Sequence, residues 1–395
     1  MTRSQCVLLL AHKLNVSGAS THMLNLGIGL QRKGWSVAVA ARELAPGTPL
    51  GKEKFEEEGI TVYEIPFPDF SDISDGVGKT LRDRGAVFAE LNQVIRRGQP
   101  SVLHAHSATL VPFARAVGGW HRIPTITTLN FGRIKQENQR AVQWGAGCTG
   151  SILGHEVIAV STEMQTRLVE TMGLPSARVH RTAYAPNSDH FRPSSDEEAR
   201  DARRSLDLEN GVPVVSLIGL LEPRKGHDVL VRAVARLRDR GCPATALCAG
   251  SGSQRDTDRV RALAEQHDVT DQVRLLGHQD AREVMWASDV TVLPSVEGGD
   301  SFGLVVVESM LCGVPVIRTP AGGATDQIVD GESGYIVPFG DDEALADRLQ
   351  RLLSDETHRR EMGTAAEQRA RSKYTKEQMA SETIEVYESA LQRFR

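Results

Sequence analysis

The sequence alternates short apolar runs with segments of helical periodicity, and this alternation constrains the fold more than any other feature. In the first half, buried strands are predicted at 6–11, 35–40, 61–65, 102–105, 125–129 and 155–160. Helices are predicted at 22–32, 78–97, 110–117 and 162–171. Short apolar strands separated by helices are typical of a parallel sheet covered on both faces.

The same alternation restarts after a polar, charged segment at 188–210. Further strands are predicted at 214–219, 245–249, 273–276 and 290–293, with helices at 228–240, 256–267 and 281–287. A chain of 395 residues is too long for one ordinary core. We therefore predict two domains, 1–187 and 188–375, and an amphipathic helix at 376–393 within the C-terminal segment 376–395.

Both domains are predicted to be Rossmann-like α/β units with doubly wound parallel sheets. In such sheets, ligands bind beyond the carboxyl ends of the strands. Two sheets that face each other leave a substrate cleft between the domains. The loops that follow strands are therefore the places to search for functional residues.

Charge and composition narrow the class of protein. The formal net charge of −5 does not indicate a general nucleic-acid surface. Five scattered cysteines, with no pair at zinc-ligand spacing, are typical of free thiols in a reducing compartment. The apolar run at 7–11 is too short for a signal peptide or a transmembrane segment. We expect a cytoplasmic protein without a membrane span, a monomer or a homodimer.

The stretch 295–341 has the strongest functional pattern. A glycine-broken acidic loop ends at Asp300, and a predicted helix at 301–312 carries Glu308. The unpaired N–H groups of a first helical turn suit an anion such as a diphosphate. Carboxylates suit sugar hydroxyls, so the stretch resembles a sugar-nucleotide site. Equally open from these residues alone, Asp300 or Ser301 caps the helix and Glu308 lies on its solvated face.

Two loops of the first half also follow predicted strands. Gly18, in the loop at 15–22, allows backbone close to a ligand phosphate; the alternative is a tight turn capped by Ser20. His104 and His106 end the strand at 102–105. A metal site needs further ligands that the sequence does not place there, so we reject it. One histidine bonding a substrate hydroxyl and a purely structural histidine remain equally open.

Two loops of the second half carry possible anion-binding groups. Arg224 and Lys225 lie in a proline-glycine loop and are placed to clamp a diphosphate; the alternative is a solvated charge pair. The loop at 249–253 has a G-x-G pattern. Arg255 stands where a dinucleotide fingerprint requires its third glycine, so nicotinamide binding is weakly supported.

Together these motifs resemble the retaining GT-B glycosyltransferases of family four. The resemblance covers nearly the whole chain and is strongest at 215–226, 249–252, 273–277 and 287–341. The segment 185–193 is similar to the hinge of that family. The resemblance implies an N-terminal acceptor domain, a C-terminal nucleotide-sugar domain, and a last helix that packs back on the first domain.

The resemblance also assigns roles by motif. Glu308 would bond the donor ribose, and Asp300 would hold the hydroxyls of the donor sugar. Lys225, with Arg224, would bind the diphosphate, and His106 would lie near the reacting sugar. The remaining donor-side positions would be Gly18, His278, Phe302, Gly303 and Leu304. His22 and Asn130 are the acceptor-side candidates.

The sequence departs from the family pattern at four positions. Leu220 replaces a usual arginine, and Asp300 replaces a usual glutamate. Ser17 replaces the first glycine of the N-terminal loop, and Asn130 replaces a histidine. The first two changes bear on the diphosphate clamp and on sugar selectivity.

We expect a retaining, metal-independent hexosyltransferase without a cofactor. Its donor would be a nucleoside diphosphate sugar, with a UDP-sugar expected. Its acceptor would be a small polar molecule, a natural-product aglycone or a glycoconjugate. His106, Lys225 and Asp300 are the expected catalytic residues. A GT-B protein that binds sugar nucleotides without turnover, or a sugar-nucleotide epimerase, is the alternative.

Overall fold

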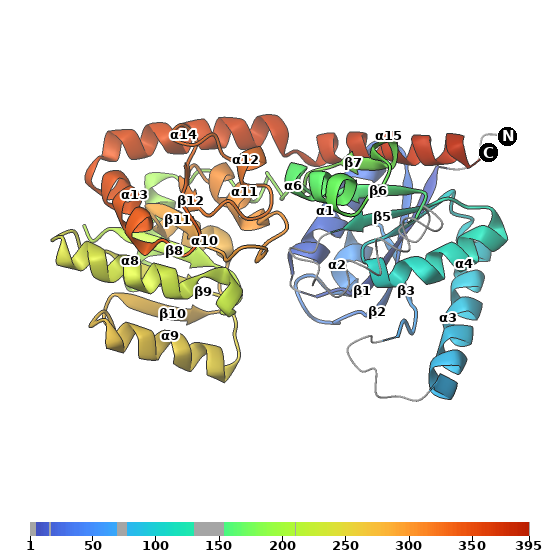
Figure 1. The fold of residues 1–395 in the computed structure, drawn as a ribbon, viewed down its shortest axis with the longest axis horizontal. Coiled ribbons are helices and arrows are strands. Elements are labelled where there is room, and N and C mark those ends of the chain that lie inside the picture. The colour runs from blue at the N-terminus through green and yellow to red at the C-terminus, as the bar shows by residue number, and fades with distance from the viewer. Residues whose placement is uncertain (1–4, 16, 69–76, 130–153, 210, 395) are drawn as a thin grey trace. The chain divides into compact units, whose positions relative to one another are not determined.

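The computed structural model describes residues 5–15, 17–68, 77–129, 154–209 and 211–394. It divides into two compact units, residues 1–185 with 376–395 and residues 186–375 (Figure 1). Each unit is a parallel sheet with helices between its strands, so the predicted pair of doubly wound α/β domains is confirmed.

Unit 1 contains a seven-stranded parallel sheet with strand order β3-β2-β1-β4-β5-β6-β7. The strands are β1 (Cys6–Lys13), β2 (Ser36–Glu43), β3 (Thr61–Glu64), β4 (Val102–Ala105), β5 (Thr125–Leu129), β6 (Glu156–Ala159) and β7 (Val179–Arg181). The helices are α1 (Gly18–Arg32), α2 (Lys52–Glu57), α3 (Val77–Gly98), α4 (Val111–His121), α6 (Thr162–Thr166) and α15 (Lys376–Arg393).

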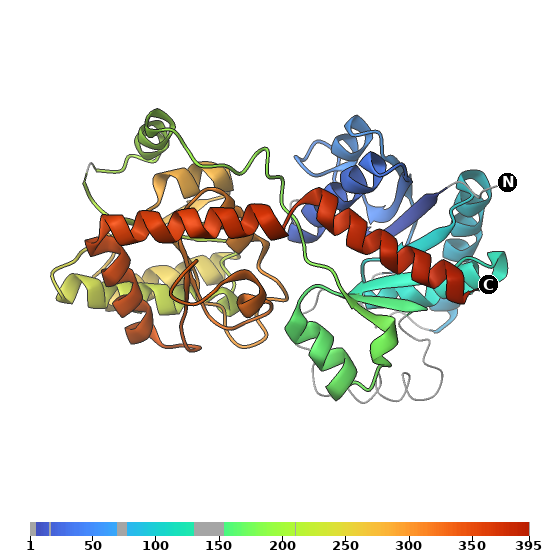
Figure 2. The same cartoon turned by 90° about the horizontal axis from the view of Figure 1, so that it is seen from above.

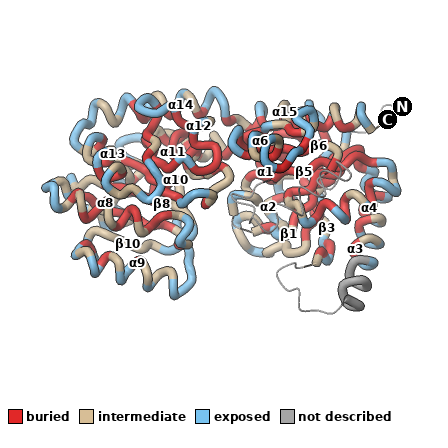
Figure 3. Tube along the Cα trace, in the orientation of Figure 1, coloured by how far each residue is buried: buried red, intermediate tan, exposed pale blue. Residues whose placement is uncertain are grey.

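Alternate residues of each strand point to opposite faces of this sheet, and helices bury both faces. Val7 and Leu9 of β1 pack in a core with α1 and α15, whereas Leu8 and Leu10 pack in a second core with α3 and α4. Figure 3 shows that buried residues follow the strands. The continuous apolar character of β1 is thus explained.

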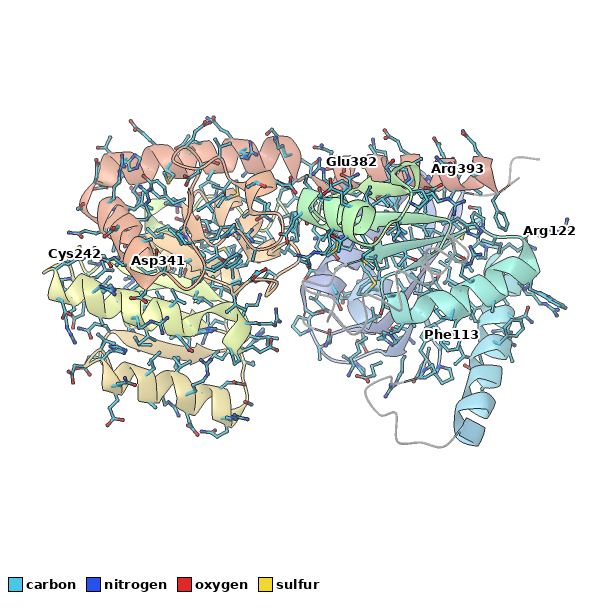
Figure 4. The ribbon with its side chains drawn as sticks, viewed as in Figure 1. Phe113, Arg122, Cys242, Asp341, Glu382 and Arg393 are labelled. Atoms are coloured by element: carbon cyan, nitrogen blue, oxygen red, sulfur yellow. The ribbon has the colours of Figure 1, made fainter. Side chains whose placement is uncertain are left out.

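The last helix, α15, belongs to the core of unit 1. It packs against α1, where a Cβ on Gly29 would lie 2.6 Å from the Lys376 carbonyl oxygen (Figure 2). Glu382 and Arg393 mark its course in Figure 4, and Arg393 Nε lies 3.4 Å from the buried Glu156 carboxylate.

Unit 2 contains a six-stranded parallel sheet with strand order β10-β9-β8-β11-β12-β13. The strands are β8 (Val214–Ile218), β9 (Thr245–Ala249), β10 (Val273–Gly277), β11 (Val290–Leu293), β12 (Val316–Arg318) and β13 (Tyr335–Ile336). The helices are α7 (Asp196–Ser205), α8 (His227–Asp239), α9 (Gln254–Gln266), α10 (Ala281–Ala287), α11 (Leu304–Leu311), α12 (Ala324–Gln327), α13 (Asp342–Ser354) and α14 (Glu356–Lys373).

Some predicted bounds were wrong for identifiable reasons. The first helix begins at Gly18 rather than 22 because the Ser17 side chain caps it and accepts from the Ser20 N–H; Ser20 is not the cap. The helix predicted at 162–171 is α-helical only to Thr166 and continues as a π-helix to Thr171. The strand β7 was missed because it is only three residues long.

Candidate functional site

In unit 2, the loops that follow β8 and β11 meet where the strand order of the sheet reverses, since these two strands are hydrogen-bonded neighbours. Such a reversal is where open α/β sheets bind ligands. Gly226 lets the two loops approach closely: its φ is +77°, and a Cβ would lie 1.9 Å from the Pro294 carbonyl oxygen. A side chain at 226 would therefore separate the loops.

This close approach places two cations around one carboxylate. Lys225 Nζ lies 2.6 Å from Asp300 Oδ1, and Ser295 Oγ donates to the other carboxylate oxygen. Lys225 and Asp300 are 12% and 9% exposed, so water screens their interaction weakly. Arg224 Nη1 donates to the Gly299 carbonyl at 2.7 Å and lies 3.9 Å from Asp300. Arg224 also pairs with the Glu222 carboxylate, so the two cations of the cluster are balanced by two carboxylates. An anionic ligand would therefore have to displace part of this ion pairing to reach Lys225.

The helix α11 begins beside this cluster, at Leu304 and not at 301 as predicted. Gly303 has a φ of +77° and is the N-cap, and no side chain caps the helix. The alternative in which Asp300 or Ser301 caps the helix was therefore wrong; Asp300 bonds Lys225 and Ser295 instead. Within the described residues, the N–H groups of Gly303 and Leu304 have no backbone partner, so they are available to an anionic ligand.

Glu308 is carried by α11 and is half-buried, not on a fully solvated face. Burial, together with the negative charge of Asp280, raises the pKa of its carboxyl to about 7. The carboxyl is thus divided between its protonated and ionised forms near neutral pH.

We predict a pH dependence of nucleotide binding from this carboxyl. In the role that the resemblance implies, the ionised form would accept hydrogen bonds from ribose hydroxyls, and this form is lost as the pH falls below about 7. Between pH 8 and pH 6 the Kd for UDP should rise about tenfold, as protonation goes from about one-tenth to nine-tenths. Calorimetric titration of Glu308→Gln should give a weaker Kd, and a higher donor KM, without this pH dependence. An equal dependence in both proteins would contradict the assignment.

His278 is exposed at the end of the edge strand β10, two strands away from β8. No contact joins it to the Lys225–Asp300 cluster among the residues described. Its part in holding a nucleobase remains a prediction.

In unit 1, the corresponding strand reversal lies between β1 and β4 and brings two predicted residues together. The rings of His22 and His106 are 5.4 Å apart, and Tyr184 stacks on His22 at 3.8 Å. Burial lowers the pKa of His106 to about 3; burial and His106 lower that of His22 well below its usual value. Both imidazoles are therefore neutral at pH 7.

These neutral rings retain hydrogen-bonding capacity. Across the described part of the chain, both ring nitrogens of His22 and Nε2 of His106 are buried without a hydrogen-bond partner. A ligand hydroxyl would satisfy such groups. His104 differs, because its two nitrogens lie 2.7 Å from the hydroxyls of Tyr387 and Thr128. His104 is thus a structural histidine, whereas Nε2 of the buried His106 is left unsatisfied among the described residues.

The Tyr387–His104 bond gives a stability prediction. Tyr387→Phe leaves a buried ring nitrogen of His104 unsatisfied, so the free energy of unfolding should fall by about 1–3 kcal/mol. Urea denaturation measures the change. Tyr63→Phe, on the edge strand β3 of the same sheet, is the control, and an equal loss in both variants would contradict the prediction.

Gly18 is the exposed first residue of α1, and open space surrounds the position of a Cβ there. A ligand therefore has room to approach, but the backbone does not require glycine. Asn130 lies outside the described residues. Among the residues that are described, no group of three or more histidine, cysteine or carboxylate side chains is placed to hold a metal ion. None of the described helices is long and apolar enough to cross a bilayer.

Two family models match most of the chain. The model of the glycosyl transferases group 1 matches residues 198–369, and that of the glycosyl transferase 4-like domain matches residues 17–185. The chain belongs to the group 1 glycosyltransferases. The matches fall within the two units, so each unit of this glycosyltransferase corresponds to one family domain.

Curated relatives of this glycosyltransferase include two D-inositol 3-phosphate glycosyltransferases. That of Corynebacterium urealyticum is 30% identical over 68% of this chain, and the match covers 66% of the relative, just under two thirds of its length. That of Stackebrandtia nassauensis is 29% identical over 96% of this chain and 88% of the relative.

Solved structures show that the fold is GT-B. A glycosyltransferase from Rickettsia africae has a TM-score of 0.82 and 20% identity, with 98% of this chain and 99% of that chain covered. Anabaena HepE, solved in complex with UDP-glucose, has a TM-score of 0.80 and 20% identity, with coverages of 97% and 99%. At these identities the similarity establishes the fold of the glycosyltransferase alone.

Several residues around the candidate site were not anticipated from the sequence. Ser295 bonds Asp300, Tyr184 stacks on His22, and Tyr387 fixes His104. Tyr387 comes from a helix more than 280 residues away in sequence, so no local pattern indicated its role. The only available signal for Ser295 was its position directly after the strand β11 and Pro294.

Proposed function

We propose that this glycosyltransferase retains anomeric configuration and transfers a hexosyl group from a nucleoside diphosphate sugar, with a UDP-sugar as the expected donor. The acceptor is the hydroxyl of a small polar molecule. The choice of a UDP-sugar as donor is supported by HepE, which shares the fold and was solved in complex with UDP-glucose.

One observation carries the proposal: the uncapped N-terminus of α11 lies next to the Lys225–Asp300 cluster. A diphosphate at this position would be stabilised by the N–H groups of Gly303 and Leu304 and by the Lys225 ammonium. Glu308, further along the same helix, supplies an acceptor for ribose hydroxyls.

The expected chemistry is departure of the diphosphate from the anomeric carbon through an oxocarbenium-like transition state. Lys225 and the helix N-terminus would stabilise the negative charge that develops on the leaving oxygen. These positive groups could do this without a metal ion, so metal independence is part of the proposal. The departing phosphate would accept the proton of the acceptor hydroxyl.

His106 fits a binding role better than an acid–base role. Its pKa of about 3 leaves the imidazole neutral and poorly basic at pH 7, while Nε2 can still form a hydrogen bond. We therefore assign it a hydrogen bond to a hydroxyl of the transferred sugar. His22 is the corresponding candidate on the acceptor side.

A polyol acceptor is the chemical class that we propose. The two relatives act, by name, on an inositol phosphate, and the neutral histidines of unit 1 suit hydroxyl groups. The identity of the acceptor of this chain is open within that class.

A donor panel tests the proposal. The protein is incubated with UDP-, GDP- and ADP-sugars and with inositol phosphates, with and without EDTA. We expect release of one nucleoside diphosphate, unaffected by EDTA, and a product with the anomeric configuration of the donor by NMR. Inversion would contradict retention. Binding without nucleotide release would indicate a module without turnover, and isomerised donor would indicate an epimerase.

A further inference from the structure

Arg318, at the end of β12, is completely buried, and it is the largest fully buried side chain among the described residues. A buried guanidinium is costly unless its donors are satisfied. The function assigned above makes no use of this residue, so its position requires another explanation.

The guanidinium of Arg318 is hydrogen-bonded to backbone carbonyl groups of two loops. Its guanidinium donates to Phe302 at 3.2 Å, to Gly322 at 3.3 Å and also to Ala321. It further donates to the Gln327 side-chain oxygen. The arginine thus ties the loop before α11 to the loop before α12.

Gln327 completes the arrangement from α12. It is fully buried, and its Nε2 donates to the carbonyls of Phe302 at 3.0 Å and Gly303 at 3.4 Å. Its oxygen accepts from Arg318, so each side chain fixes the orientation of the other. Both buried side chains therefore donate to the Phe302 carbonyl, and Gln327 also donates to the Gly303 carbonyl.

The direction of these carbonyls sets the direction of the neighbouring N–H groups. In a planar trans peptide, C=O and the following N–H point in opposite directions. With the carbonyls of Phe302 and Gly303 turned toward Arg318 and Gln327, the N–H groups of Gly303 and Leu304 point away from this buried pair. These are the N–H groups to which we assign the diphosphate.

The charge of Arg318 acts on the same side of the site. Its Nη1 and Nη2 atoms lie 3.4 and 3.6 Å from the position that a Cβ on Gly303 would take. The guanidinium thus adds positive potential directly behind the N-terminus of α11, in an interior that screens charge weakly.

We propose that Arg318 and Gln327 are positioning residues that hold the peptide groups of Phe302–Leu304 in the orientation that binds the donor diphosphate. This inference rests on the proposed function, since it needs a diphosphate at α11. Neither side chain touches the ligand; both act through the backbone.

Calorimetry with UDP and with uridine tests the inference, because only UDP carries the diphosphate. In Arg318→Lys, which keeps the charge but loses the planar fork, and in Gln327→Met, the Kd for UDP should rise at least about tenfold. The Kd for uridine should stay within about twofold. A merely structural role would lower the melting temperature without changing the ratio of the two Kd values.

Arg369→Met is the matched control. Arg369 donates to the carbonyls of Gln327 at 2.6 Å and Asp326 at 2.8 Å, so it supports α12 without touching the 302–304 peptides. The ratio of the Kd for UDP to the Kd for uridine should be the same in Arg369→Met as in the wild type. If Gln327→Met and Arg318→Lys fold and keep the wild-type ratio of the two Kd values, the inference is wrong, and the proposed function is unaffected. Failure of the wild type to bind any of UDP, GDP and ADP overturns the proposed function and the inference with it.

Discussion

Lys225→Ala should lower the kcat of the transferase by about 10²–10³-fold, because it removes the ammonium group to which we assign the stabilisation of the departing diphosphate. Lys225 Nζ lies 2.6 Å from Asp300 Oδ1 and next to the uncapped end of α11, and among the described residues it is the ammonium group of this cluster. Steady-state kinetics with saturating donor measures the effect on the chemical step.

Lys373→Ala is the control for Lys225→Ala, since Lys373 is an exposed lysine at the end of α14 in the same unit. It should leave kcat unchanged. Wild-type kinetics for Lys225→Ala would contradict the assignment of Lys225 to the diphosphate. They would point instead to Arg224, whose Nη1 lies 3.9 Å from the Asp300 carboxylate.

Gly226→Ala should both destabilise unit 2 and abolish donor binding. The new Cβ would overlap the Pro294 carbonyl oxygen at 1.9 Å, and the residue would have to keep a φ of +77° or move. Either outcome separates the loops after β8 and β11 that place Lys225 beside Asp300. We expect a loss of about 3 kcal/mol or more in the free energy of unfolding.

Gly241→Ala separates backbone strain from overlap. Gly241 has a φ of +73°, but nothing lies within 4 Å of its Cβ position. The control should therefore cost only about 1–2 kcal/mol and leave the Kd for UDP unchanged. Equal destabilisation by the two substitutions in urea denaturation would show that the close approach of the loops is unimportant.

The fold was predictable from the sequence because each strand is a short apolar run followed by a helix. The predicted strands at 102–105, 125–129, 245–249 and 290–293 and the helix at 281–287 have the observed bounds. Errors occurred where a single residue determines the end of an element. Gly303 has a positive φ and is the N-cap of α11, so the helix begins at Leu304 and not at residue 301. A Cβ at position 303 would lie 2.9 Å from Leu293 and 3.4 Å from Arg318, a constraint that a local pattern does not reveal.

The candidate site was predictable only in part. Sequence reasoning placed Asp300 as a partner of sugar hydroxyls, whereas the structure pairs its carboxylate with Lys225 and Ser295. Its contact with a sugar remains a prediction, and one that requires this ion pair to rearrange. The roles of Arg318 and Gln327 could not be predicted, because they depend on two loops meeting behind α11. The one signal was a charged residue ending an apolar strand.

A structure of the protein crystallised with UDP tests the central claim most directly. The account predicts the diphosphate within hydrogen-bonding distance of Lys225 Nζ and of the N–H groups of Gly303 and Leu304, with the ribose hydroxyls at Glu308. A diphosphate bound elsewhere, with these N–H groups and Lys225 unengaged, would contradict it.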